Sequence, residues 1–285
     1  MYKEFYHLRE SPFNVTSDPD FFFSSAHHIE AFAHLFYGIQ QRKGIIVITG
    51  EIGTGKTTLC RMLLNRLDKS VRTALILNPN FSAIQLLQII VKDLGIEGDF
   101  KNKFALVNAL NEFLIQETSH GHNVVIIIDE AQNLSVRQLE QIRLLSNLET
   151  AKEKLLQIVL IGQPELAEKL KLSSLRQLNQ RVTVRYHIMP LSKEELRYYI
   201  HHRLKIAQSP DNSSSRREPT GHRPIGSSRI HFTDGAIDLI YEKSQGTPRM
   251  INILCDRALL AGFIAETHTI DDNIIQRSVA EVVFA

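Results

Sequence analysis

The stretch TGEIGTGKTTLC, which begins at Thr49, has the residue types and spacing of a phosphate-binding loop. It contains the pattern G-x-x-x-x-G-K-[ST], preceded by a strand-like apolar run and followed by a helical pattern, the context that this motif requires. The glycines let backbone N–H groups turn toward a phosphate, while Lys56 can reach the β- and γ-phosphates and the Thr57 hydroxyl can hold Mg²⁺. The sequence therefore predicts a nucleotide site formed by Gly50, Glu51, Ile52, Gly53, Thr54, Gly55, Lys56, Thr57 and Thr58.

An acidic pair, Asp129 and Glu130, follows a second apolar run at residues 124–128. Ligand sites form at the carboxyl ends of parallel strands, so we expect this pair beside the loop. Asp129 suits Mg²⁺ binding together with Thr57, and Glu130 is placed to polarise an attacking water. Read alone, the run could be a strand that ends in a cap. Together with the loop it predicts hydrolysis, with Glu130 and Lys56 as catalytic residues.

Two further polar residues are candidates for contact with the phosphates. Gln163 ends an apolar run at residues 158–161 and would lie beside the γ-phosphate, although an ordinary polar residue in a strand-end turn is the alternative. Arg249 follows Pro248 at the start of a helical pattern, where proline is well tolerated. From there Arg249 could swing from a helical domain onto the phosphates; a salt-bridged structural arginine is the alternative.

Three arginines lie just before or within the last apolar run, namely Arg176, Arg181 and Arg185. An arginine here can lie at a subunit edge and reach the γ-phosphate of a neighbouring subunit, which is the role of an arginine finger. At least one of the three is an ordinary surface residue. We favour Arg181, then Arg176, and expect a homo-oligomer whose subunit number the sequence leaves open.

Apolar runs and helical patterns alternate along the first two thirds of the chain. The alternation predicts a doubly wound α/β domain with a parallel sheet, because helices must cover both faces of strands that are apolar on both sides. The order of the runs permits the strand at 158–161 to insert between the two strands that carry the motifs. The expected strands are residues 45–49, 72–77, 124–128, 158–161 and 182–188, and the expected helices include residues 57–67, 84–94 and 104–118.

The pattern changes after Pro190, where strand-like runs give way to helices. Ser192 and Glu195 form a capping-box pattern at the start of one helix. Thr233 is expected to cap a second helix, and Gly246 is expected to end it. We therefore expect a small all-helical domain. We divide the chain into an N-terminal segment at 1–40, an α/β domain at 41–190 and a helical lid at 191–285.

A stretch at residues 209–229, rich in Ser, Pro, Gly and Arg, interrupts this helical domain and is expected to be a disordered loop. Its arginines could be simply solvated or could contact an acidic partner. They are Arg216, Arg217, Arg223 and Arg229.

Composition excludes several classes of protein. The net charge of the 285 residues is +2, so no strong field favours nucleic acid or an anionic membrane. The charged N-terminus has no apolar signal-peptide core, and the longest apolar runs are too short to span a bilayer. The two cysteines, Cys60 and Cys255, are expected to be buried thiols rather than a disulfide. These features predict a cytoplasmic protein without a membrane span, at most peripheral at the inner membrane through a partner.

Taken together, these motifs resemble those of an AAA+ ATPase, and more narrowly those of the ExeA/GspA family of general secretion pathway ATPases. The similarity lies in TGEIGTGKTTLCR, IIIDE, DEAQNL, IGQPEL, LNQRV and GTPRMIN, and in the N-terminal FYHLRESPFNVTSDPDFFFSS. It implies a P-loop fold of AAA+ type with a five-stranded parallel sheet and a helical lid, Gln163 near the sensor 1 position and Arg249 as sensor 2. It also implies that residues 13–23 form a wall near the adenine, with aromatic core packing as the alternative.

The resemblance implies an ATPase that uses ATP and Mg²⁺ to drive assembly or remodelling in a general secretion or type IV pilus-like system, with envelope proteins as possible partners. Longer members of the family carry a transmembrane helix and a peptidoglycan-binding domain after the ATPase, so this sequence is expected to be an isolated, MshM-like ATPase module. The alternative function is a DNA-associated regulator of transposition of the TniB/TnsC type. Against that alternative stand the near-neutral charge and the lack of room for a winged-helix domain after residue 232.

Overall fold

The computed structural model describes residues 1–16, 18–150, 153–208 and 230–283, and it divides into two compact units. The α/β unit comprises Ala26–Glu51 and Lys56–Met189, and the helical unit comprises Met1–Ser25, Ile52–Gly55 and Pro190–Ala285. The loop predicted at 209–229, with its four arginines, lies outside the described residues.

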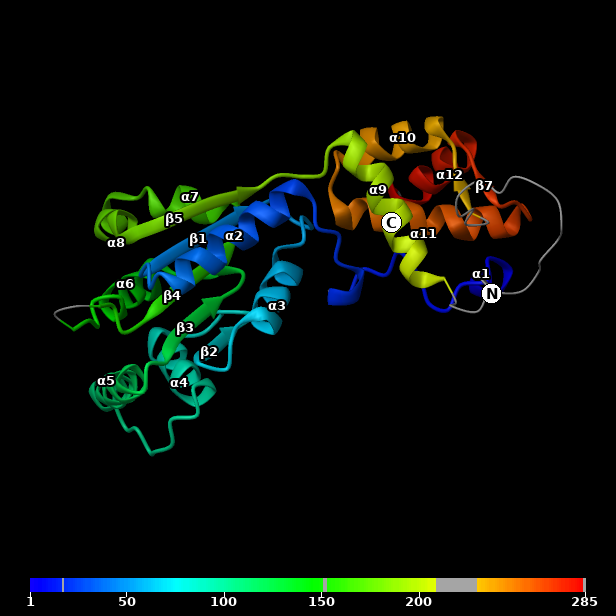
Figure 1. Ribbon diagram of the computed structural model, residues 1–285. Helices are drawn as coiled ribbons and strands as arrows, with labels where there is room; N and C mark the ends of the chain where they lie inside the picture. Colours follow the sequence, from blue (N-terminus) through cyan, green and yellow to red (C-terminus); the bar gives the residue numbers. More distant parts are fainter. Residues whose placement is uncertain (17, 151–152, 209–229, 284–285) are drawn as a thin grey trace. The chain divides into compact units, whose positions relative to one another are not determined.

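The α/β unit is built on a five-stranded sheet in which every neighbouring pair is parallel (Figure 1). The strand order is β2-β3-β4-β1-β5, so β4 lies between the strands that carry the loop and the acidic pair, as the sequence permitted. The ends of the strands lie within one residue of the predicted ends. They are β1 (Ile45–Gly50), β2 (Val71–Ile76), β3 (Asn123–Ile128), β4 (Gln157–Gly162) and β5 (Val182–Ile188).

Helices cover both faces of this sheet, which explains why β1, β3 and β4 are buried at every position. On one face, alternate strand residues such as Ile45, Val124 and Ile158 join a core with leucines and isoleucines from α4 to α8. On the other face α2 approaches so closely that a Cβ on Gly38 would lie 2.5 Å from Ile46. The helices are α2 (Ala26–Gln40), α3 (Lys56–Arg66), α4 (Ala83–Asp93), α5 (Lys103–Ser119), α6 (Val136–Leu145), α7 (Pro164–Leu170) and α8 (Arg176–Arg181), with short 3-10 turns η2 (Ala131–Asn133) and η3 (Ser173–Leu175).

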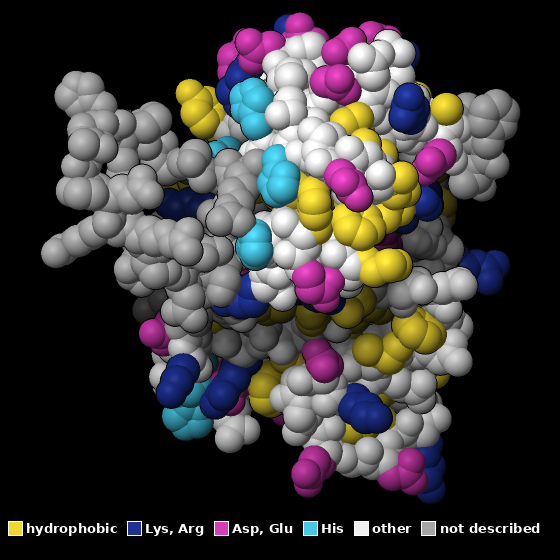
Figure 2. Space-filling view, turned by 90° about the vertical axis from the view of Figure 1, so that its right-hand side faces the viewer, with side chains coloured by type: hydrophobic (Ala, Val, Ile, Leu, Met, Phe, Trp, Pro, Cys, Tyr) yellow, Lys and Arg dark blue, Asp and Glu magenta, His cyan; other side chains and the backbone are white. Residues whose placement is uncertain are grey.

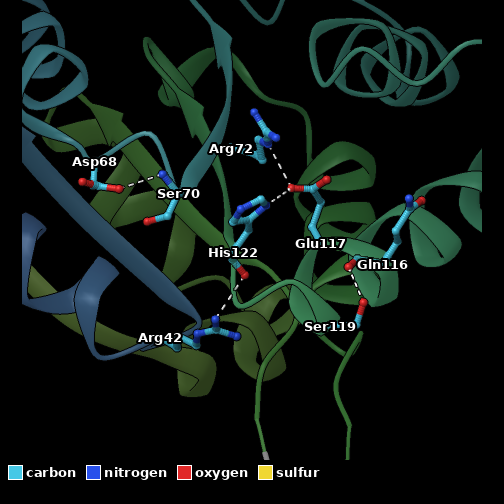
Figure 3. Close-up of polar contacts among 8 residues, drawn as sticks. All are labelled: Arg42, Asp68, Ser70, Arg72, Gln116, Glu117, Ser119 and His122. Atoms are coloured by element: carbon cyan, nitrogen blue, oxygen red, sulfur yellow. Dashed lines mark hydrogen bonds and ion pairs between the residues drawn. The ribbon is translucent and has the colours of Figure 1, made fainter.

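Polar contacts fasten the amino-terminal edge of the sheet, where β2 and β3 begin (Figure 3). Glu117, near the end of α5, accepts hydrogen bonds from Arg72 Nε at 2.9 Å and from His122 Nδ1 at 2.7 Å. Burial alone would raise the pKa of Glu117, but these two partners hold it below its usual value. Arg42 donates to the backbone oxygen of His122 at 3.1 Å and pairs with Glu153 at 2.8 Å. This edge is therefore held by charges, whereas the centre of the sheet is apolar.

The helical unit has its own core, formed by buried side chains of α9 (Lys193–Ala207), α10 (Asp234–Ser244), α11 (Pro248–Ile264) and α12 (Asp272–Val283). The capping box at Ser192 and the cap at Thr233 are both present, and α10 ends in a left-handed Gln245 just before Gly246. One pair of two-residue parallel strands, β6 (His231–Phe232) and β7 (Thr269–Ile270), was not predicted. Each strand is too short to show a hydrophobic period.

Side chains of the N-terminal segment, among them Tyr6, Phe13 and Phe21, pack into this helical core. Where the structure describes this segment, its regular structure consists of α1 (Tyr2–Phe5) and the 3-10 turn η1 (Pro19–Phe21). Arg203 of α9 holds them in place, because its guanidinium is buried and donates to the backbone oxygens of Pro12 at 2.5 Å and Asn14 at 3.0 Å. Phe13 is 1% exposed and Phe21 lies under Arg203. Both rings therefore pack in the core of the helical unit, and the wall near the adenine stays a prediction.

The two cysteines are free and buried, as predicted, one in each unit. Burial raises the pKa of the Cys60 thiol to about 12 and also raises the pKa of Cys255. Both groups are therefore neutral at physiological pH and behave as small apolar side chains.

The surface shows no segregation of charge on the face drawn in Figure 2, where acidic and basic side chains are both scattered. This distribution agrees with the net charge of +2. None of the helices in the described ranges has the length and apolar character needed to cross a bilayer.

Candidate functional site

The predicted phosphate loop joins β1 to α3, and its backbone has the conformation that only glycine adopts readily. Gly53 and Gly55 have φ angles of 81° and 93°, in the left-handed region. Glu51 and Ile52 are exposed, Thr54 is fully buried, and Thr58 lies half-buried in the first turn of α3. The loop therefore begins at the carboxyl end of a buried strand and ends at a helix N-terminus, which is an anion-binding arrangement.

Lys56 is the first residue of α3, and its side chain turns back over the loop. Its Nζ donates to the backbone oxygens of Gly50 at 2.7 Å and Glu51 at 2.8 Å, and the residue is 6% exposed. Burial lowers the pKa of Lys56, opposed by the negative charges of Glu130 and Asp129. The loop thus holds a buried ammonium group whose hydrogen-bond acceptors are neutral carbonyls.

Thr57, in the first turn of α3, contacts Asp129, which directly follows β3, although 72 residues separate them. The Thr57 hydroxyl donates to Asp129 Oδ2 at 2.6 Å, and the backbone N–H of Glu130 donates to Oδ1 at 2.9 Å. Asp129 is 2% exposed, and burial raises its pKa despite these two donors. A buried carboxylate and a hydroxyl oxygen are thereby placed side by side, and both are ligands suited to Mg²⁺.

Glu130 and Gln163 also come together, because β4 lies beside β3. Gln163 Nε2 donates to Glu130 Oε2 at 3.3 Å. Gln132 donates to the same oxygen through Nε2 at 2.5 Å, and its Oε1 accepts from the backbone N–H of Gln163 at 3.0 Å. Glu130 itself has a left-handed backbone, with φ 52°, a conformation that is uncommon for this residue type and typical of functional sites.

Arg181 does not join this group, because it lies at the opposite edge of the sheet. β1 and β5 run parallel, with Ile45 beside Val182 and Gly50 beside Ile188. Since β1 rises about 3.3 Å per residue, its length places Arg181 roughly 20 Å from the loop of its own chain. There Arg181 lines a pocket of about 770 Å³ with Arg42, Lys154, Thr183 and neighbouring residues. Burial and the charge of Arg181 together lower the pKa of Lys154.

The other two candidate arginines differ in their contacts. Arg185 donates to the backbone oxygen of Asn179 at 2.9 Å and to its Oδ1 at 2.6 Å, so its guanidinium has partners within its own chain. Burial lowers its pKa. Arg176 is exposed at the first position of α8. These contacts make Arg185 the weakest of the three finger candidates.

Arg249 lies at the second position of α11, after Pro248, as the sequence indicated. Within the helical unit, which includes residues 52–55, its backbone N–H donates to the oxygen of Gly53 at 3.2 Å. A Cβ on Gly53 would lie 2.5 Å from Cβ of Arg249, so this contact depends on glycine. The side chain of Arg249 is exposed.

Two residues beside the site, Gln132 and Lys169, were not predicted to have a role there. Lys169 of α7 donates through Nζ to the backbone oxygens of Leu134, at 2.9 Å, and Gln132. Gln132 lies in the stretch DEAQNL, which the family resemblance includes, but the length of the turn there could not be read from hydrophobic periodicity.

Comparison with known proteins shows what the chain is similar to. The family profile described as "AAA domain" matches residues 39–170. The chain is 40% identical over 283 residues to General secretion pathway protein A of Aeromonas hydrophila, in an alignment that covers 99% of this chain and 48% of that protein. The chain therefore spans about half the length of this curated relative.

Solved structures share the fold. Cdc6p from Pyrobaculum aerophilum superposes with a TM-score of 0.63 at 14% identity, over 98% of this chain and 71% of that one. The Aeropyrum pernix ORC2 protein, solved as ADPNP-ADP complexes, gives a TM-score of 0.58 at 15% identity, over 89% and 66% of the two chains. At these identities the likeness concerns the fold alone, which is that of the AAA+ P-loop ATPases.

Proposed function

We propose that this AAA-domain chain, similar over nearly its whole length to General secretion pathway protein A, binds ATP with Mg²⁺ and hydrolyses it. The observation that carries this proposal is the convergence of Lys56, Thr57, Asp129 and Glu130 at one edge of the sheet. Nucleotide-bound relatives of the same fold support ATP as the ligand.

In the proposed reaction, Lys56 exchanges its carbonyl partners for the β- and γ-phosphate oxygens, which are charged and therefore better acceptors. Glu130 accepts a proton from a water molecule as the water oxygen attacks the γ-phosphorus. The bond from the γ-phosphorus to the bridging oxygen breaks, and ADP leaves with the electron pair. Gln163 and Arg249 are proposed to contact the phosphates during this step.

Thr57 and Asp129 fit the requirements of Mg²⁺, which takes one or two protein oxygens and completes its octahedron with phosphates and waters. When bound, the ion would neutralise charge that develops on the phosphates. The buried Asp129 carboxylate, whose pKa is raised, would also gain a counter-charge.

We further propose that the protein works as a homo-oligomer in which Arg181 completes the site of a neighbouring subunit. Its distance from the loop of its own chain supports action between subunits.

The process that hydrolysis drives is proposed to be assembly or remodelling in a secretion or pilus-like system, carried out from the cytoplasmic side. The name and 40% identity of the relative support this role. The same relative is why the transposition alternative is not favoured.

The catalytic assignment is tested by Glu130→Gln. This change keeps the size of the side chain and removes the base, so kcat for phosphate release should fall by roughly 10²–10⁴-fold while KM for ATP stays within about twofold. Glu112→Gln, at an exposed position of α5, is the matched control and should be unchanged. Equal turnover in wild type and Glu130→Gln would show that the assignment is wrong.

The secretion role needs a separate test. Deleting the gene in its native host should reduce the export of secreted proteins or the assembly of pili, and a plasmid encoding Glu130→Gln should not restore it. If export and pilus assembly are both normal in the deletion strain, the secretion role is wrong while the ATPase assignment can still hold.

A further inference from the structure

The amide of Gln132 joins the ends of two neighbouring strands at the catalytic edge. The 3-10 turn η2 carries Gln132 back over the end of β4. There its Nε2 donates to Glu130 Oε2 at 2.5 Å, and its Oε1 accepts from Gln163 N–H at 3.0 Å. One side chain therefore contacts both the proposed base and the residue proposed to sense the γ-phosphate.

The neighbouring residues leave space for the Gln132 side chain and hold its turn in place. A Cβ on Gly162 would lie 2.8 Å from Gln132 Oε1 and 3.2 Å from its backbone nitrogen. Gly162 does not have a positive φ, so what glycine provides there is space: a larger residue would displace the Gln132 amide. Lys169 also holds the turn in place, because its Nζ donates to the backbone oxygens of Gln132 and Leu134.

We propose that Gln132 is a positioning residue that fixes the orientation of the Glu130 carboxylate and ties it to the end of β4. This inference rests on the proposed function, because Glu130 acts as a base only in that reaction. Both amide donors, from Gln132 and Gln163, reach Oε2. Because both donors occupy Oε2, Oε1 is assigned as the oxygen that takes the proton from water.

Two variants separate positioning from mere packing. Gln132→Glu has the same shape and still accepts from Gln163 N–H, but it sets a second carboxylate against Glu130. Two carboxylates at this distance share a proton, so the acidic limb of the kcat–pH profile should move to higher pH. Gln132→Met has a similar length and lacks both hydrogen bonds, so kcat should fall by about tenfold. The acidic limb of its kcat–pH profile should shift less than that of Gln132→Glu. KM for ATP should stay within about twofold in both variants.

Gln116→Glu, on α5 at the opposite edge of the sheet, adds the same charge as a control and should leave the profile unchanged. If both Gln132 variants keep the wild-type kcat and profile while Glu130→Gln is inactive, the role of Gln132 is wrong and the proposed function stands. The positioning role is also wrong if both variants only lower thermal stability and raise KM. If Glu130→Gln is as active as wild type, the proposed function itself fails.

Discussion

Two oppositely charged groups, Lys56 and Asp129, are buried at the same edge of the sheet. Burial lowers the pKa of Lys56 and raises that of Asp129, so each charge is maintained at an energetic cost that the other only partly offsets. A phosphate would supply an acceptor for Lys56, and a divalent cation would supply a counter-charge for Asp129. At the scale of single residues, the protein alone is therefore less stable than the same fold with these groups neutralised.

This cost leads to a prediction for Asp129→Asn. Because the pKa of Asp129 is raised in the folded protein, the protonated form is the one that folding favours, and ionisation as the pH rises destabilises the fold. Asparagine resembles the protonated form, so without nucleotide the variant should have a higher Tm than wild type at pH 7. The difference should shrink as the pH is lowered toward the range where Asp129 protonates.

The measurement is thermal unfolding of both proteins between about pH 5 and pH 8, with Mg²⁺-dependent ATP turnover measured in parallel. Turnover should be lost in the variant. Thr57→Ser, which keeps the hydroxyl, serves as the control for a small change in the same contact. A lower Tm for Asp129→Asn at pH 7 would contradict the prediction.

At the scale of elements, the loop depends on two separate properties of Gly53. Its φ of 81° is a conformation that costs other residues about 1–2 kcal/mol. In addition, the carbon that any other residue would add meets Cβ of Arg249 at 2.5 Å. The first property concerns the loop alone, while the second ties the loop to the start of α11.

Gly121 allows the two contributions to be separated, because its φ is 78° and nothing lies within 4 Å of the added carbon. Gly121→Ala should lower the Tm by a few degrees, since about 1 kcal/mol corresponds to roughly 2–4 °C in a protein of this size. Gly53→Ala should lower it further and should also raise KM for ATP several-fold, because crowding displaces the loop. Equal losses of Tm in the two variants, with KM unchanged in both, would show that the contact with Arg249 is unimportant.

At the scale of the whole molecule, the position of Arg181 predicts that subunits share their active sites. The residue lies at the amino-terminal edge of the sheet, in the pocket with Arg42 and Lys154, while the loop lies at the carboxyl edge. A chain with Glu130→Gln should be inactive but still supply Arg181, and a chain with Arg181→Ala should be inactive but still supply Glu130.

Mixing these two inactive variants should restore ATP turnover. In a random one-to-one mixture about a quarter of the interfaces combine an intact Glu130 with an intact Arg181, so activity should approach about a quarter of that of wild type. A mixture of Glu130→Gln with Lys56→Ala is the matched control, because both defects lie in the same site and mixing brings no new pair of complementary residues together. If the first mixture is no more active than the control, Arg181 does not act between subunits.

The sequence by itself determined the loop, the acidic pair, the succession of strands and helices along the chain, and the helix caps at Ser192 and Thr233. All of these depend on residues close together in the chain, since a turn, a cap or a strand is set by local dihedral angles, hydrogen bonds and the hydrophobic period. The strand boundaries differ from the predicted ones by at most one residue for the same reason.

Only the tertiary structure decided which distant polar groups meet. Gln163 reaches Glu130 because β4 inserts beside β3, and Gln132 reaches both because the turn after the acidic pair bends back over Gly162. Parallel pairing likewise places Arg181 at the far edge, and Arg203 holds residues 12–14 in the helical unit. The contact between Gln132 and Gln163 joins residues 31 positions apart, and those of Arg203 join residues 189 or more apart. They depend on strand order and packing, which the local pattern of residue types permits but does not specify.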